Sequence, residues 1–104
     1  MPFKVVFLAH AKDAEPEKDR SIVETSTYKL YSIVVKDQVQ AVYECKKLVK
    51  EESIHSVLLC PGFSDKNVAE ITEAVGENVG VAVARGDGSG RKVPADVRIR
   101  AYSS

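Results

Sequence analysis

The chain has 104 residues, which is enough for one domain with a single modest core. Fifteen basic residues balance fifteen acidic ones, and 44% of the residues are hydrophobic. A neutral chain lacks the field that draws proteins to nucleic acid, and no apolar run approaches the about 20 residues that span a bilayer. We therefore expect neither nucleic acid nor a membrane as a partner. The two cysteines, Cys45 and Cys60, suggest no disulfide framework, which fits the reducing cytoplasm.

Residues 3–9 form an almost continuous apolar run whose only charge is Lys4. Such a run is typical of a strand that is covered on both faces in the middle of a parallel sheet. A polar stretch follows, from His10 to Thr27. It contains Pro16, a residue that the first turn of a helix accepts. We therefore expect a short helix over residues 15–23.

Residues 28–35 are rich in β-branched and aromatic side chains and predict a second strand. Asp37 is a good helix N-cap, and Gln40, three residues later, completes a capping-box pattern. The apolar residues that follow are spaced along one face of a helix and are Ala41, Val42, Cys45, Leu48 and Val49. The first long helix is expected here.

Residues 54–60 form a third strand that is strongly apolar and stops at a Pro-Gly turn. A second long helix begins directly after this turn, with Asp65 or Ser64 as its cap. Gly76 is suited to the end of that helix. Residues 79–84 predict a fourth buried strand.

The alternation of strands and helices predicts an α/β fold with a small, open, mostly parallel sheet of four strands and flanking helices. The two most apolar strands, 3–9 and 54–60, belong in its centre. We therefore favour the flavodoxin-like order 2-1-3-4, with a serial order as the alternative. We expect one domain over residues 1–86, and a flexible loop and tail over residues 87–104. The tail alternates apolar and polar side chains over residues 97–101 and can supply an extra C-terminal strand at the sheet edge or to a partner subunit.

The order 2-1-3-4 brings together the carboxyl ends of the first and third strands, the place where open α/β sheets bind ligands. His10 follows the first strand, Cys60 ends the third and Arg85 follows the fourth. Proximity to a helix start favours the thiolate of Cys60, and His10 is the available base for a nucleophilic thiol. Ordinary structural roles, an exposed loop histidine and an inert buried thiol, are the alternatives for these two residues.

Gly62 allows the backbone to approach a ligand closely, and free amides follow at Phe63 and Ser64. A carboxylate or a phosphate is the natural guest at a helix start, and Arg85 can pair with it. Thr25, just before the second strand, is a further candidate for the same crevice. An acidic residue in the first helical turn opposes an anion there, and Phe63 also suits the core.

No His, Cys, Asp or Glu cluster has the spacing of metal ligands, and the Gly-rich run at residues 86–90 fits no nucleotide-binding motif. We expect no metal and no cofactor. The leading hypothesis is a cytoplasmic domain that binds a small anionic metabolite at the carboxyl ends of the strands. The alternatives are a small enzyme that uses Cys60 with His10, and a structural or regulatory subunit. A small open sheet needs its edges covered, so we expect a homodimer in each case.

Four features of the sequence occur together: an apolar strand at residues 3–9, Glu24-Thr25 before the second strand, a Cys-Pro-Gly-Phe loop at residues 60–63, and a Val-Gly-Val strand that ends in Arg85. This combination resembles a small uncharacterised family of α/β proteins, a domain of unknown function. The resemblance spans residues 3–86 and implies the fold, but no substrate. Pro61 stands where the family pattern has glycine, and the amide that it removes weakens the case for an anion at this turn.

Overall fold

The structure is a computed structural model and describes residues 2–84. The expected loop and tail at residues 87–104, with the extra C-terminal strand, lie outside these residues. The described elements are β1 (Phe3–His10), β2 (Arg20–Glu24), β3 (Tyr28–Val35), α1 (Gln38–Glu52), β4 (Ser56–Leu59), α2 (Asp65–Val75) and β5 (Gly80–Val83). No helix among them is long and apolar enough to cross a membrane.

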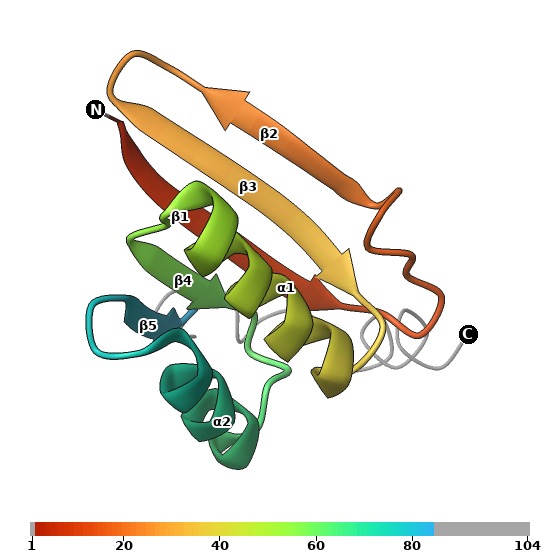
Figure 1. Cartoon of the computed structure of the whole chain (residues 1–104). Helices are drawn as coiled ribbons and strands as arrows, with labels where there is room; N and C mark the ends of the chain where they lie inside the picture. The colour runs from red at the N-terminus through yellow and green to blue at the C-terminus, as the bar shows by residue number, and fades with distance from the viewer. Residues whose placement is uncertain (1, 85–104) are drawn as a thin grey trace.

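The strands form one sheet in the order β2-β3-β1-β4-β5 (Figure 1). β1 pairs in parallel with both β3 and β4, and β4 pairs in parallel with β5. The four strands expected from the sequence are β1, β3, β4 and β5, and their order confirms the 2-1-3-4 arrangement. β2 adds a fifth strand that runs antiparallel to β3 at the edge of the sheet.

The helix expected over residues 15–23 is wrong. The segment makes a single turn, in which the amide of Asp19 donates to the carbonyl of Glu15 and the Asp19 carboxylate accepts from the Glu15 amide. The chain then extends into β2. Ile22 and Val23 are β-branched and favour a strand, and the free edge of β3 supplies the hydrogen-bond partners.

Side-chain caps set the start of both helices. The Asp37 carboxylate accepts from the Gln40 amide at 3.0 Å, and the Gln40 side chain accepts from the Lys36 amide at 2.7 Å. The capping pattern predicted from the sequence is therefore present, with its return bond one residue earlier. In α2, Ser64 is the N-cap, and its hydroxyl oxygen accepts from the Asn67 amide at 3.1 Å.

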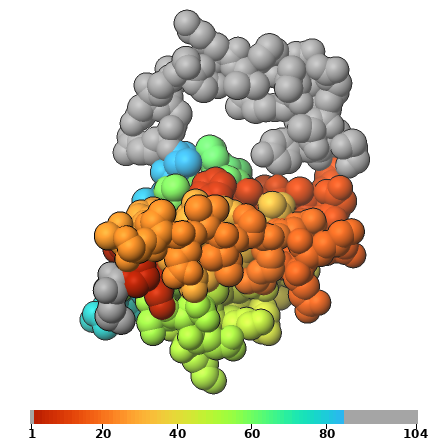
Figure 2. All heavy atoms as spheres, turned by 90° about the horizontal axis from the view of Figure 1, so that it is seen from above, coloured from red at the N-terminus to blue at the C-terminus, as the bar shows by residue number. Residues whose placement is uncertain are grey.

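Both helices pack against the same face of the sheet (Figure 1). The β3-α1-β4 and β4-α2-β5 connections advance across the sheet in the same direction, and right-handed crossovers then place both helices on one side. Figure 2 shows α1 in green on one side of the β2–β3 hairpin. The core lies between the helices and this face and contains Val6, Leu8, Tyr31, Ile33, Val35, Ala41, Cys45, Leu48, Val57, Leu59, Ile71 and Val75.

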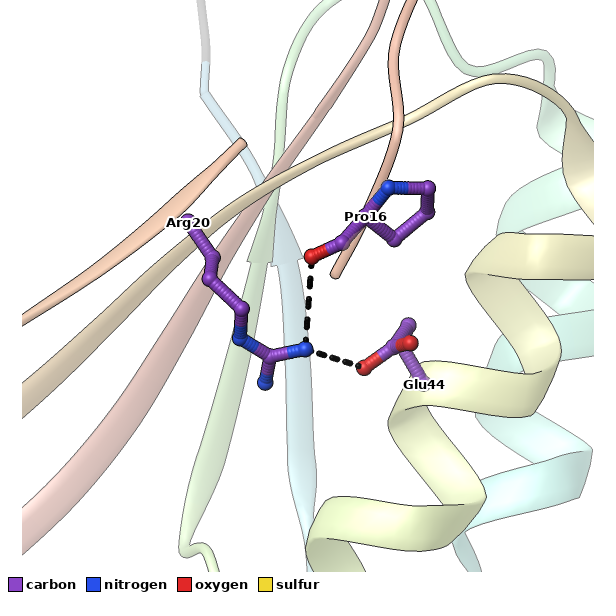
Figure 3. A network of polar contacts seen from close by, with 3 residues as sticks. All are labelled: Pro16, Arg20 and Glu44. Carbon is purple, nitrogen blue, oxygen red and sulfur yellow. Dashed lines mark hydrogen bonds and ion pairs between the residues drawn. The ribbon is translucent and has the colours of Figure 1, made fainter. Parts of the chain in front are cut away.

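A buried ion pair fastens the edge strand to α1 (Figure 3). Arg20, at the start of β2, donates from Nη1 to Glu44 Oε1 at 3.2 Å and to the carbonyl of Pro16 at 3.4 Å. Glu44 is only 4% exposed, so its carboxylate depends on this partner for compensation. One guanidinium therefore holds β2, the loop before it and α1 together.

Glu44→Gln should lower the free energy of unfolding by about 1–2 kcal/mol, because Arg20 loses a charged acceptor in a partly buried site. Denaturant unfolding measures this change. Glu15→Gln is the matched control, since Glu15 pairs with Lys18 at 3.8 Å on the surface and should change stability by less than about 0.5 kcal/mol. Equal effects of the two substitutions would show that the Arg20–Glu44 pair does not anchor the edge.

Burial, with a smaller contribution from the charge of Glu44, raises the pKa of the Cys45 thiol to about 12. The unfolded chain then loses this proton near pH 9 while the folded protein keeps it, so stability should fall as the pH rises from 9 towards 12. The loss approaches about 1.4 kcal/mol per pH unit. Unfolding of the wild type and of Cys45→Ala over this range measures the difference, and parallel pH profiles would contradict the expectation.

Candidate functional site

The site predicted from the sequence lies where β1 and β4 end side by side. Leu8 of β1 pairs with Leu59 of β4, and the amide of Cys60 donates to the carbonyl of Leu8 at 2.9 Å. His10 is the last residue of β1. β4 follows β3 in the chain but lies next to β1 in the sheet, so the loops after β1 and β4 both begin at this end of the sheet. Open α/β sheets bind ligands at positions of this kind.

The imidazole of His10 and the thiol of Cys60 both lie close to Gly62. A Cβ atom at this position would lie 2.7 Å from Nε2 of His10 and 3.6 Å from Sγ of Cys60. Only glycine leaves room for the histidine ring in this arrangement. The structure therefore brings together three of the predicted residues, and both side chains face the same side of the loop backbone.

Phe63 forms the inner wall of this cluster. Its side chain is 6% exposed and belongs to the core, and its ring meets the half-buried ring of His10 edge-on, with 4.9 Å between ring centroids. The Phe63 amide donates to the carbonyl of Cys60 at 3.3 Å and closes the turn. The aromatic contact fixes the orientation of the imidazole. Cys60 is also only 6% exposed, so reagents in solution have little access to its sulfur.

The start of α2 follows directly after this loop. Ser64 caps the helix through Asn67, and within residues 2–84 no acceptor faces the amides of Asp65 and Lys66. These amides carry the positive end of the helix dipole. The carboxylate of Asp65 in the first turn partly offsets that field. The groups at this end of the sheet therefore include an imidazole, a thiol and two backbone donors.

Of the two other predicted ligand residues, Thr25 does not join this cluster. Thr25 lies at the opposite end of the sheet, so its expected place in the crevice is wrong. It belongs to the turn between β2 and β3, where its hydroxyl oxygen accepts from the Tyr28 amide at 3.0 Å. The reason is the antiparallel course of β2, which carries the chain away from the carboxyl ends. Arg85 lies outside the described residues, and its role stays a prediction.

The sequence did not indicate a hollow of about 520 Å³ between the loop before β2 and the start of α1, away from His10 and Cys60. Its charged lining consists of Glu15, Glu17, Lys18, Lys36 and Glu44. Three carboxylates against two ammonium groups do not favour an anion here. The residues that line this hollow come from two segments that are distant in sequence, so no local sequence pattern predicts it. The helix that we expected over residues 15–23 also implied a different course for the first of these segments. Within residues 2–84, no three His, Cys, Asp or Glu side chains gather as metal ligands.

Comparison with known proteins identifies the family but no activity. No curated protein and no solved structure matches the chain significantly. Residues 3–96 of the 104 match a family described as a family of unknown function, DUF6506. The resemblance expected from the Cys-x-Gly-Phe loop is thus confirmed, and the match extends beyond β5. The chain belongs to the DUF6506 family of α/β proteins, whose function is unknown.

Proposed function

We propose that this protein binds a small anionic metabolite at the carboxyl ends of β1 and β4. The observation that carries the proposal is the direct pairing of these two strands, which are neighbours in space but not in sequence. This is the position at which open α/β sheets form ligand crevices. It also collects His10, Cys60 and Gly62 around one point.

The chemistry of the crevice favours an anion of small size. The amides of Asp65 and Lys66 offer hydrogen bonds along the axis of α2, and the His10 imidazole adds a donor or a positive charge. Gly62 keeps the His10 imidazole next to the loop backbone, because a Cβ at this position would collide with the ring. The Asp65 carboxylate opposes this field, so we expect affinity in the range of a metabolite-binding protein rather than a tight phosphate clamp.

Addition of small carboxylates and phosphates should shift the backbone amide resonances of residues 60–66 in ¹⁵N NMR spectra. Gly62→Ala should weaken this binding at least tenfold, since the new methyl group would displace the imidazole. Gly80→Ala is the matched control, because a Cβ at Gly80 meets no atom within 4 Å.

Shifts that stay the same in Gly62→Ala would contradict the proposed site. So would amide shifts confined to the hollow near Glu44. Thermal unfolding of both glycine variants without ligand separates a loss of binding from a loss of the fold.

The meeting of a thiol and an imidazole supports a second candidate function, chemistry at Cys60. In this scheme Nε2 of His10 takes the thiol proton, and the thiolate sulfur bonds to an electrophilic carbon of the substrate while the leaving group departs from that carbon with its bonding electron pair. Both reacting atoms, Nε2 of His10 and Sγ of Cys60, lie within 3.6 Å of the point that a Cβ at position 62 would occupy. This closeness favours chemistry at Cys60. The low exposure of Cys60 opposes it, so binding remains the primary proposal.

Alkylation by iodoacetamide, in which the sulfur–carbon bond forms and iodide leaves, tests the second candidate in a Cys45→Ala background. If His10 activates Cys60, His10→Ala should slow alkylation at pH 7 at least threefold. His55→Ala is the control, because His55 lies at the other end of the sheet and accepts a hydrogen bond from the Lys4 amide. If the alkylation rate of Cys60 follows the titration of a free thiol, near pH 8.5, both in the presence and in the absence of His10, then His10 does not activate Cys60.

A further inference from the structure

The face of the sheet opposite the helices is mostly apolar, and none of its side chains from the described strands β1–β5 is charged. Alternation along the paired strands assigns one set of side chains to this open face. The set comprises Phe3, Val5, Phe7, Ala9, Ser21, Val23, Tyr28, Leu30, Ser32, Val34, Ser56, Leu58, Gly80 and Ala82. The charged strand residues Lys4, Arg20, Glu24 and Lys29 all belong to the helix side. Among residues 2–84, no helix covers the open face.

Large side chains remain exposed at one end of this open face. Phe3 is 48% exposed, Tyr28 42% and Val23 59%. The ring of Phe3 stacks on His55 with 5.4 Å between centroids and meets Tyr28 at 5.9 Å. Rings that are already held by their neighbours lose little freedom on binding and act as anchors in protein interfaces.

We propose that the open face packs against the same face of a second copy of this chain, so that two sheets enclose a shared core. A neutral apolar face can pack against the same face of a second copy, because two-fold symmetry then brings no like charges together. Parallel strands of this apolar character are ordinarily covered on both faces, and here the helices cover one. Face-to-face packing of two sheets completes the second layer.

The size of the face is sufficient for a dimer. β1 and β3 each have eight residues. At about 3.3 Å per residue and 4.8 Å between strands, a five-stranded face measures roughly 500 Å². Two such faces bury on the order of 1,000 Å², the lower limit for a specific interface. The dimer should therefore dissociate measurably on dilution.

Other surfaces and partners fit less well. The free edge of β2 is only five residues long and has Arg20 and Glu24 at its ends, which protects it from pairing with another edge. A membrane surface would call for basic residues beside the apolar ones, and none of the strand positions on the open face is basic. An acidic or basic peptide would find no opposite charge.

Sedimentation velocity of the full chain at micromolar to millimolar concentration tests the proposal. We expect a species of twice the 11.4 kDa chain mass that dissociates on dilution. Val23→Lys and Phe3→Lys should each weaken the dimer at least tenfold, because each substitution would bury a positive charge in the apolar interface with the second copy. Ile22→Lys is the matched control, since Ile22 is 55% exposed on the same strand but belongs to the helix side.

Each of the following outcomes would overturn the proposal: a monomer at millimolar concentration, a dimer that neither Val23→Lys nor Phe3→Lys weakens, or equal effects of Val23→Lys and Ile22→Lys. Methyl signals of Leu30 and Leu58 give an independent readout with a soluble paramagnetic agent. They should be shielded at high concentration and exposed on dilution. Shielding that persists in a monomer would show that the chain covers the face itself, which also rejects the second copy.

Discussion

The position of β1 between β3 and β4 is the constraint on which the rest of this structure depends. Val6 and Leu8, on its helix side, are completely buried, and hydrogen bonds hold the strand on both sides. Its apolar sequence is favourable only in the middle of a sheet. With β1 in the centre, β4 pairs with the edge of β1 that β3 leaves free. The loop after β4, which carries Cys60 and Gly62, then lies next to His10 at the end of β1.

The same constraint distributes the helices. After β3, both crossovers advance in one direction, so α1 and α2 cover the same face. The connection from β1 to β3 contains the edge strand β2. In a doubly wound protein, the corresponding connection contains a helix that covers the other face of the sheet. The open face of the sheet follows from this exchange of a helix for β2.

Physical reasoning from the sequence succeeded where the signal was local or followed from burial. The apolar runs at residues 3–9 and 54–60 gave the central strands, and their adjacency gave the meeting of His10 and Cys60. It failed where the determinant was a distant partner. β2 pairs with the free edge of β3, and Glu44, a charged residue in an amphipathic helix, is buried because Arg20 reaches it from another element. Thr25 was misplaced because its position depends on the course of β2.

Crystal structures of the full chain soaked with a library of small carboxylates and phosphates would test the proposed site most directly. We expect bound anions between the His10 imidazole, the Gly62 backbone and the first amides of α2. Anions that instead collect in the hollow beside Glu44, with the crevice between β1 and β4 empty in every soak, would contradict the assignment of the binding site to the strand ends.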